Sequence, residues 1–312
     1  MERISDFSLE GLVSDLESEL KTAIDDLPEV EQVDGDFSAK NIPNPSDSKW
    51  VKLPEVVVVF FDLKNSTHLG VSRHDKSSAR IYTSAVESSV KILHEFEADF
   101  IDIQGDGGFG IYWGDMAYER AFCAAVKIRT FSETLVKKLE AKWVALDEVG
   151  TGFKVGMHAG RTLVKKLGTR NKVSEQEPVW AGKPVNYAAK CAQSAQRHQI
   201  VVTQSVWDKL STNDHIAFSC GCSGSGIAQL WQDKTVETLP QKEQDAVVLN
   251  SQWCDNCGEE FCREILTGSK RRQDVPETIR NAVRDTKAFK SLQRKKQQEN
   301  NTLNGLKNVR VR

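Results

Sequence analysis

A run of six β-branched or aromatic residues, Val56 to Phe61, constrains the fold more than any other feature of the sequence. Such a run predicts a buried strand. The run ends at Asp62, and the small polar residues Asn65, Ser66 and Thr67 follow shortly after it. Residues 100–113 hold two further apolar runs around a Gly-Asp-Gly-Gly turn, which predicts a β-hairpin with Asp106 at its tip. If the hairpin and the strand are neighbours in one sheet, Asp106 lies beside Asp62.

These two aspartates together predict a metal site. Two carboxylates that converge on one point do not both stay ionised at low cost unless a cation lies between them. Oxygen ligands, with free backbone N–H groups in the loop after Asp62, suit Mg²⁺ or Mn²⁺ carrying a nucleotide. The alternative is that Asp62 caps a helix or faces solvent and that Asp106 belongs to an ordinary turn. Each aspartate alone favours the alternative, whereas the pair, with a third motif described below, favours the metal site.

The order of the predicted elements indicates the fold class. After the first strand, apolar residues at helical spacing predict a helix over residues 77–96, and the hairpin follows. The later elements are predicted, in chain order, as helix 116–143, strand 153–160, strand 178–181, helix 184–196 and strand 200–203. The order β-α-β-β-α-β is that of the ferredoxin-like α+β fold. This topology allows the end of the first strand to lie beside the hairpin tip.

The third motif opens the helix predicted from residue 184. Pro184 suits the first turn of a helix, so Asn186 and Lys190, four residues apart, share one face near its N-terminus. A carboxamide and an ammonium group there, aided by the helix dipole, suit an anionic phosphate group. The alternative is a pair of solvated surface side chains, which is the commoner case for such residues taken alone.

Three segments in this order resemble the class III nucleotide cyclases, the adenylate and guanylate cyclase catalytic domains. The segments are Phe-Phe-Asp62-Leu-x-x-Ser-Thr, Gly-Asp106-Gly between apolar strands, and Gly-x-x-Val-Asn186-x-Ala-Ala-Lys190. A fourth segment, Val-Gly-Met-His-Ala-Gly-Arg161, also fits. The resemblance covers residues 52–218.

The resemblance implies a head-to-tail homodimer with composite active sites at the interface. One subunit would bind two divalent cations, Mn²⁺ or Mg²⁺, and would contact the triphosphate through Arg161. The implied metal ligands are Asp62, the carbonyl of Leu63, and Asp106. The other subunit would orient the ribose through Asn186 and supply the cation of Lys190. The implied reaction is attack of the ribose 3′-oxygen on the α-phosphorus of a nucleoside triphosphate, with pyrophosphate leaving.

Several positions depart from the purine cyclases. Lys190 stands where the family usually has Arg, which keeps the charge but loses the planar fork. At the position of Asp102, adenylate cyclases place Lys and guanylate cyclases place Glu, and at the position of Val179 they place Asp, Thr or Cys. Val179 cannot form a hydrogen bond, and a buried unpaired base edge costs about 1–3 kcal/mol. Asp102, Val179 and Trp180 are therefore predicted to line the base site, where a smaller base leaves room that Trp180 or Tyr187 could fill.

Five of the seven cysteines follow residue 219, which predicts a zinc-binding module over residues 219–272. A Cys-x-x-Cys pair and a Cys-x-Cys pair together offer four thiolates, the ligand set of many structural zinc sites. The predicted ligands are Cys220, Cys222, Cys254 and Cys257, with Cys262 as a further candidate. Trp231, Trp253 and Phe261 are the predicted core of the module. The alternative is a set of scattered buried thiols.

A cyclase domain with non-purine base positions, followed by such a module, resembles the pyrimidine cyclases of the bacterial Pycsar anti-phage systems. The resemblance implies that UTP is converted to cyclic UMP, a second messenger in antiviral defence that an effector protein detects. Cytidylate and adenylate cyclases are alternative enzymes. Another alternative is a degenerate domain that binds a nucleotide without turnover. Two features favour it: a lysine at position 190, and the absence of a phosphate-binding lysine from residues 219–226.

The two ends of the chain carry opposite charge. Residues 1–50 have 13 acidic and 4 basic side chains. An apolar stripe at helical spacing predicts an amphipathic helix over residues 5–27, docked on the body or on a partner subunit and followed by an acidic linker. The stripe consists of Phe7, Leu9, Leu12, Leu16, Leu20, Ile24 and Leu27. Residues 268–312 have 13 basic and 4 acidic side chains. From residue 273 they are predicted to form a basic helical tail, so the catalytic domain covers residues 51–218. The positive charge of the tail suits contact with nucleic acid, with a phage component or with the acidic segment of a neighbouring subunit. A nucleic-acid-binding function driven by this tail is a further alternative to a cyclase.

No apolar run in the sequence approaches 18 residues, and the N-terminal residues lack a signal-peptide pattern. We therefore expect a cytoplasmic protein without a membrane partner. In that compartment the cysteines are reduced thiols or metal ligands rather than disulfides.

Overall fold

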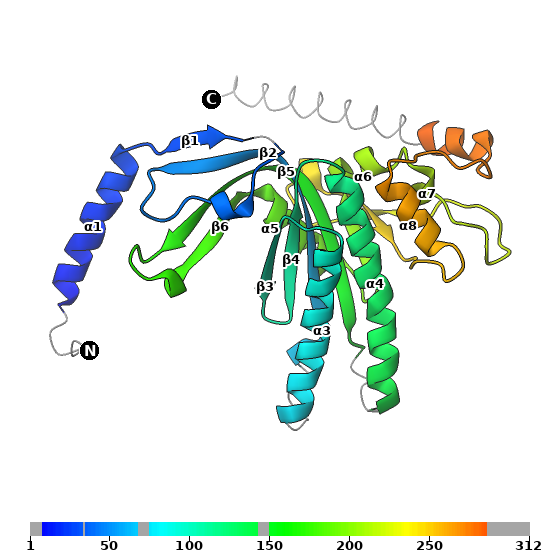
Figure 1. Ribbon diagram of the computed structural model, residues 1–312, viewed down its shortest axis with the longest axis horizontal. Coiled ribbons are helices and arrows are strands. Elements are labelled where there is room, and N and C mark those ends of the chain that lie inside the picture. Colours follow the sequence, from blue (N-terminus) through cyan, green and yellow to red (C-terminus); the bar gives the residue numbers. More distant parts are fainter. Residues whose placement is uncertain (1–7, 34, 68–74, 143–149, 286–312) are drawn as a thin grey trace, which may run out of the picture. The chain divides into compact units, whose positions relative to one another are not determined.

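The computed structural model describes residues 8–33, 35–67, 75–142 and 150–285 (Figure 1). They divide into two compact units. The first unit consists of Met1–Val56 and Gly160–Lys183, and the second of Val57–Ala159 and Pro184–Arg312. Strands β2 (Lys49–Lys64) and β5 (Gly152–Gly168) are long and contribute residues to both units.

The second unit is built on a sheet with the strand order β3-β4-β2-β5-β7-β9-β8. Its first part contains, in chain order, β2, α3 (Asp75–Glu95), β3 (Phe100–Gln104), β4 (Gly107–Tyr112), α4 (Ala117–Lys142) and β5. The spatial order β3-β4-β2-β5 is that of the ferredoxin-like fold. The predicted α+β class and the predicted β-hairpin are therefore confirmed.

The later elements of the second unit extend the same sheet. They are α5 (Lys183–Ser194), β7 (Gln199–Thr203), α6 (Gln204–Leu210), α7 (Asp214–Ala217), β8 (Trp231–Thr235), η5 (Gln241–Glu243), β9 (Asp245–Leu249) and α8 (Gly258–Leu266). Trp231 was expected in the core of a separate cysteine module. It instead lies in the core of this sheet, with its ring 4.9 Å from that of Trp207 and 6.1 Å from that of Phe122.

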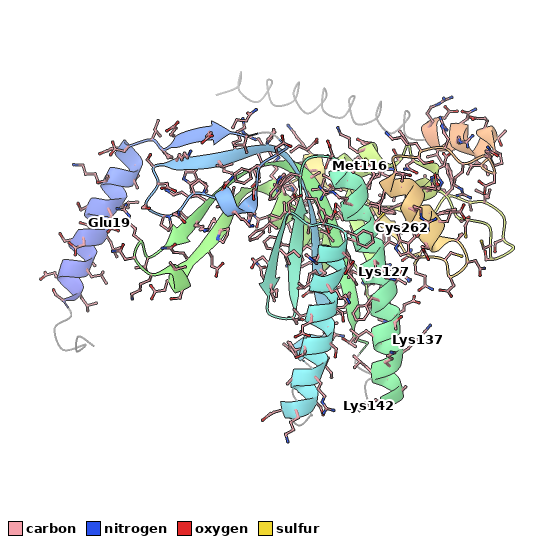
Figure 2. All side chains as sticks on the ribbon, viewed as in Figure 1. Glu19, Met116, Lys127, Lys137, Lys142 and Cys262 are labelled. Carbon is pink, nitrogen blue, oxygen red and sulfur yellow. The ribbon has the colours of Figure 1, made fainter. Side chains whose placement is uncertain are left out.

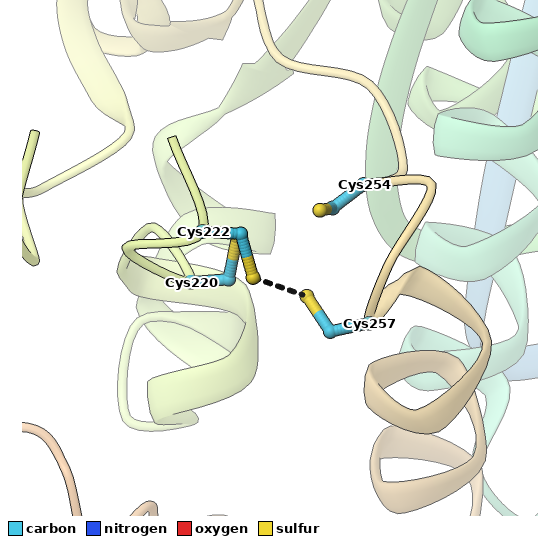
Figure 3. Close-up of side chains that lie close together, drawn as sticks. All are labelled: Cys220, Cys222, Cys254 and Cys257. Atoms are coloured by element: carbon cyan, nitrogen blue, oxygen red, sulfur yellow. Dashed lines mark hydrogen bonds between the residues drawn. The ribbon is translucent and has the colours of Figure 1, made fainter. Parts of the chain in front are cut away.

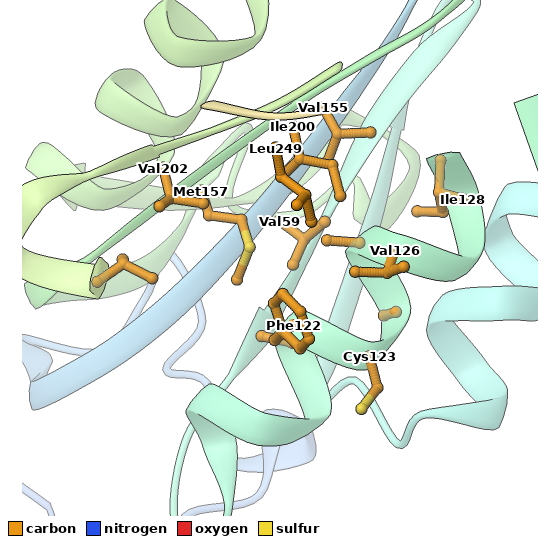
Figure 4. Close-up of a cluster of buried hydrophobic side chains, with 14 of the residues drawn as sticks. Val59, Phe122, Cys123, Val126, Ile128, Val155, Met157, Ile200, Val202 and Leu249 are labelled. Atoms are coloured by element: carbon orange, nitrogen blue, oxygen red, sulfur yellow. The ribbon is translucent and has the colours of Figure 1, made fainter. Parts of the chain in front are cut away.

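Side chains of the strands alternate between the two faces of the sheet, and each face packs against helices. On one face, buried strand residues contact α4 through Phe122, Cys123, Val126 and Ile128 (Figure 4). The strand residues labelled there are Val59, Val155, Met157, Ile200, Val202 and Leu249. On the other face, Val201, Ala246 and Val248 pack against Tyr187 and Cys191 of α5. The outer side of α4 is charged, and Lys127, Lys137 and Lys142 are exposed along it (Figure 2).

Helix α5 lies directly on strand β5 because position 156 is a glycine. A Cβ atom on Gly156 would lie 2.0 Å from the carbonyl oxygen of Ala188 and 2.3 Å from the backbone nitrogen of Ala192. No side chain fits at that distance, so helix and strand backbones are in contact. This contact fixes the height of α5, which carries Asn186 and Lys190, above the sheet.

In the first unit, short strands pair with the two long ones. β1 (Glu29–Gln32) pairs in parallel with the start of β2, and β6 (Gln176–Gly182) pairs antiparallel with the end of β5. η2 (Ala39–Asn41) and η4 (Val173–Glu175) are single turns. The segment 28–49 is therefore not a free linker as predicted. Because the segment is rich in acidic residues, its sequence did not indicate a strand. The strand is stabilised by hydrogen bonds to β2 and by an ion pair of 2.6 Å between Glu31 and Lys49.

Helix α1 (Leu9–Asp25) confirms the predicted N-terminal helix. Its Ser8 side chain accepts a hydrogen bond of 3.1 Å from the backbone N–H of Gly11, as an N-cap should. All residues of α1 are exposed, including the predicted apolar stripe Leu9, Leu12, Leu16, Leu20 and Ile24. Glu19 marks this helix in Figure 2. Phe7, which belongs to the same predicted stripe, lies outside the described residues. Docking of the stripe on a partner subunit stays a prediction.

The described part of the C-terminal region is helical over residues 277–285, and Ile279 and Val283 pack against the core of the second unit. Ala288, Phe289 and Leu292, which continue the predicted basic helix, lie outside the described residues. None of the helices in the described ranges has the length and the apolar character needed to cross a membrane.

The contact at Gly156 generates a prediction about stability. We expect Gly156→Ala to lower the free energy of unfolding by about 1–3 kcal/mol, because its methyl group overlaps the backbone of α5. Thermal unfolding followed by circular dichroism would measure the loss. Gly11→Ala is the matched control, since its nearest neighbour, Ser8 Oγ, lies 3.4 Å from the added Cβ in an exposed helix. An unchanged unfolding temperature for Gly156→Ala would contradict the close packing.

Candidate active site

The β3–β4 turn lies beside the end of β2. Strands β2 and β4 are antiparallel, with Phe61 opposite Gly108. At the next position a Cβ atom on Gly107 would lie 2.5 Å from the carbonyl oxygen of Phe61 and 3.2 Å from the Cα atom of Asp62. Only glycine allows this approach. The structure therefore brings Asp106, the residue before Gly107, next to Asp62, as the sequence predicted.

The two carboxylates have different environments. One oxygen of Asp106, Oδ2, is buried and has no hydrogen-bond partner among the described residues. Asp62 is half-buried, and its Oδ2 forms an ion pair of 2.5 Å with Nζ of Lys154. A buried carboxylate oxygen no longer forms hydrogen bonds with water. It therefore destabilises the folded protein unless a hydrogen-bond donor or a cation contacts it. The pair of aspartates, as an all-oxygen donor set with one unsatisfied oxygen, fits Mg²⁺ or Mn²⁺.

Lys154 is a residue of this site that the sequence reasoning missed. Its side chain is 15% exposed, and it lies in β5, the strand next to β2 in the sheet. A signal was present, because Lys154 is a single cation in the otherwise apolar or small run from Phe153 to Met157. In the described chain this ammonium group balances the charge of Asp62.

Other predicted residues of the second unit lie near these elements. Leu63 follows Asp62 on β2, and its side chain is buried in the core. Asp102 lies on β3 opposite Phe109 and accepts a hydrogen bond of 3.2 Å from Nε2 of Gln104. Its carboxylate is partly exposed.

Asn186 and Lys190 lie on α5, as predicted. Asn186 is exposed in the first turn of the helix. The Nζ atom of Lys190 donates a hydrogen bond of 3.0 Å to the carbonyl oxygen of Thr238 and lies 5.7 Å from the ring centre of Tyr187. Lys190 is thus held within its own subunit, with its charge facing a neutral carbonyl group.

The remaining predicted residues belong to the first unit. Arg161 is exposed on β5. Val179 and Trp180 are consecutive on β6, where they pair with Lys165 and Val164. Successive strand residues point to opposite faces, which explains why Val179 is 39% exposed and Trp180 only 8% exposed. One face of β6 therefore offers Val179, and the other offers Trp180.

The four predicted cysteine ligands come together in the second unit (Figure 3). The sulfur atoms of Cys220, Cys222, Cys254 and Cys257 all lie within 4.8 Å of one another. Two of them, on Cys222 and Cys257, are 3.7 Å apart. Backbone N–H groups of Asn256 and Cys257 lower the pKa of the Cys254 thiol to about 7. Burial and the neighbouring thiols raise the pKa of Cys257. It is therefore the four-sulfur geometry, the ligand set of structural zinc sites, that suits a metal ion.

Buried contacts hold the segment that carries Cys220. Arg272 has its side chain 4% exposed and donates to the carbonyl oxygens of Phe218 (3.2 Å) and Ser219 (3.0 Å). On the other side of the cluster, the N–H of Gly258 donates a hydrogen bond of 2.8 Å to the carbonyl oxygen of Cys254. Helix α8 begins at Gly258. The cysteines are therefore arranged by the surrounding fold.

The family model of the adenylate and guanylate cyclase catalytic domain matches residues 50–226. The chain belongs to this family. A protein of Propioniciclava tarda named uridylate cyclase is 55% identical over 98% of this chain and 99% of its own length. Another of that name, from Micromonospora echinofusca, is 43% identical over 87% of this chain and 88% of its own.

Among solved structures, the adenylyl cyclase CyaB from P. aeruginosa is similar in fold, with a TM-score of 0.53 and 12% identity. The similarity covers 73% of this chain and 99% of that chain. The resemblance to nucleotide cyclases that the sequence motifs indicated is therefore confirmed, and with it a nucleotide cyclase domain. The names of the relatives agree with the pyrimidine group among these enzymes.

The ion pair at Asp62 generates a second prediction. Lys154→Met should tighten binding of Mn²⁺ about two- to fivefold, because the methionine keeps the volume and removes a competing cation. Calorimetric titration with Mn²⁺ would measure the affinity. Lys172→Met is the matched control, since it breaks an exposed ion pair with Glu175 of 3.1 Å and should change nothing. Asp106→Asn should remove the binding, and equal or weaker binding by Lys154→Met would contradict the assignment.

Proposed function

We propose that the protein is a uridylate cyclase, which converts UTP to cyclic UMP and pyrophosphate as a homodimer with composite active sites. The observation that carries the proposal is the Asp62–Asp106 pair inside a cyclase catalytic domain. One oxygen of Asp106 is buried and has no partner in the described part of the chain. Relatives named uridylate cyclase that align over 98% and 87% of the chain support uracil as the base.

In this proposal each subunit contributes half of each active site. Asp62, Asp106 and the carbonyl of Leu63 hold two divalent cations, Mn²⁺ or Mg²⁺, and Arg161 binds the triphosphate. Bound cations of this kind acidify the ribose 3′-hydroxyl and neutralise charge on the phosphates. From the second subunit, Asn186 orients the ribose so that its 3′-oxygen is in line with the leaving pyrophosphate. Lys190 neutralises the charge that grows on the oxygen between the α- and β-phosphates.

The proposed base site contains Asp102, Val179 and Trp180. The carboxylate of Asp102 can only accept hydrogen bonds while it is ionised, and uracil offers it the N3–H group. The amino group of cytosine is also a donor, which keeps CTP as the competing substrate. A base site for a purine would need a hydrogen-bonding group at this position, and the exposed side chain of Val179 offers none.

The biological role that we propose is signalling in antiviral defence in the cytoplasm. Cyclic UMP would be the second messenger, and an effector protein would detect it. The support is the resemblance to the pyrimidine cyclases of the Pycsar systems. The C-terminal region, with its basic residues, is the proposed contact for a phage component or nucleic acid.

We also propose that the cysteine cluster binds one structural zinc ion. Four sulfur atoms within 4.8 Å of one another form the tetrathiolate set of structural zinc sites. The cluster joins the segment after α7 to the start of α8, so the ion would cross-link two parts of the chain that are 32 residues apart at Cys222 and Cys254.

Zinc content tests this proposal. Freshly purified protein that has met no chelator should carry about one zinc ion per chain by elemental mass spectrometry. Cys254→Ser/Cys257→Ser should carry none and should unfold at a lower temperature, because the cross-link is lost. The matched control is Cys262→Ser, which changes a fifth cysteine of the same region and should keep its zinc. Zinc-free wild-type protein, or zinc lost from the control alone, would refute the assignment.

Mixing two inactive variants tests the composite site. Asp62→Ala and Asn186→Ala homodimers should each be inactive, since every site has one damaged half. In a mixture that exchanges subunits, a mixed dimer has one intact site, and activity should return to about a quarter of the wild-type value if assembly is random. The assay is conversion of radiolabelled UTP to cyclic UMP, with CTP, ATP and GTP measured in parallel.

A second mixture controls for nonspecific recovery. Asp62→Ala with Asp106→Ala damages the same half of the site in both chains, so no mixture of them should regain activity. If the first mixture also stays inactive despite proven subunit exchange, the composite site is wrong. Wild-type protein that binds nucleotides without turning over any of the four would favour the degenerate sensor. Loss of function on deletion of the tail, with Asp62→Ala unaffected, would favour nucleic-acid binding.

A further inference from the structure

Helix α5 carries a large aromatic side chain between the two residues proposed for catalysis. Tyr187 follows Asn186 and precedes Lys190 by three positions, so its ring and the lysine share one helix face. The Nζ atom of Lys190 lies 5.7 Å from the centre of this ring, within the range of a cation–π contact. Tyr187 is only 8% exposed, which means that the ring is fixed by its surroundings.

A series of polar side chains in contact with one another supports the Tyr187 ring on the side of the sheet. The ring of His158, on β5, lies 4.9 Å from that of Tyr187 at an angle of 50°. His158 is 7% exposed, and its Nδ1 lies 2.9 Å from Oγ1 of Thr203 on β7. Thr203 is in turn 3.0 Å from Oγ of Ser205. These contacts determine the orientation of the imidazole, and through it they limit the movement of Tyr187.

A second contact fixes the ammonium group. Nζ of Lys190 donates a hydrogen bond of 3.0 Å to the carbonyl oxygen of Thr238, in the segment after β8. On either side of Thr238, Val236 and Leu239 are buried in the same cluster as Tyr187. Within the described ranges, no carboxylate forms an ion pair with Lys190. Its positive charge is therefore held in place without being neutralised, and it stays available to a phosphate anion.

We propose that Tyr187, supported by His158, is a positioning residue that holds Lys190 for the phosphate chain of the nucleotide. This inference rests on the proposed function. Lysine has a flexible four-carbon stem and a compact charge, whereas an arginine fork is planar and binds phosphate through two parallel hydrogen bonds. A chain that uses lysine must order it by other contacts. The Tyr187 ring and the Thr238 carbonyl provide that order.

The test compares kcat and KM for UTP in variants of Tyr187. Tyr187→Leu should lower kcat about tenfold at nearly constant KM, because Lys190 loses one of the two contacts that order its side chain. Tyr187→Phe keeps the ring and should restore kcat to within about twofold of the wild-type value. The matched control is Tyr118→Leu, which removes a ring 5.8 Å from Nζ of Lys209, a contact of the same kind between residues without a proposed role. It should leave kcat unchanged.

A double-mutant cycle separates positioning from a general effect on folding. In a Lys190→Ala background, Tyr187→Leu should cause no further loss of kcat, because the group that it positions is absent. Independent, multiplicative losses would overturn the inference, as would a wild-type kcat for Tyr187→Leu. If Tyr187→Leu does not fold, Tyr187→Met enters the same cycle. Wild-type turnover by Lys190→Ala would instead remove Lys190 from the proposed active site, and the inference would fail with it.

Discussion

The close approach of the β3–β4 turn to the end of β2 is the constraint on which the candidate site depends. Because Gly107 has no side chain, the turn can touch the backbone at Phe61 and Asp62. Among the residues that the structure describes, the approach leaves one oxygen of Asp106 buried and without a donor, while Lys154 balances Asp62. Such a pair is unfavourable for stability alone. The rest of the fold must hold it in place, and the sheet does so by burying the strands on both sides of it.

The sheet also connects the candidate site to the cysteine cluster. β7, β9 and β8 continue the sheet beyond β5, and α4 packs across it. Arg129 of α4 is buried and donates to the carbonyl oxygens of His198 (3.0 Å) and Asn250 (2.5 Å). These bonds hold the chain just before β7 and just after β9, at the end of this antiparallel pair from which the chain continues to Cys254. Next to the cysteine cluster, Trp253 and Cys262 pack against the same hydrophobic core as α4.

Helix α5 shows how the same sheet positions the second set of candidate residues. Its backbone touches β5 at Gly156, so its distance from the sheet is fixed. Tyr187 then packs on the sheet, while Asn186 stays exposed. Asn186 is therefore exposed in the first turn of α5, and Lys190 is held one turn further along by Tyr187 and Thr238. In the role that we propose for Lys190, the ring of Tyr187 compensates for the planar fork that an arginine would bring.

The sequence by itself determined the elements whose signal is local. The apolar run before Asp62, the Gly-Asp-Gly-Gly turn and the helical spacing from residue 77 to 96 predicted the ferredoxin-like order, and the motifs predicted the family. Only the tertiary structure decided the rest. It paired Lys154 with Asp62, made a strand of residues 29–32, two of which are acidic, and placed Trp231 in the main core instead of a separate one. These outcomes depend on contacts between strands that are far apart in sequence. A local sequence pattern does not show which strands will pair or which surfaces they will bury.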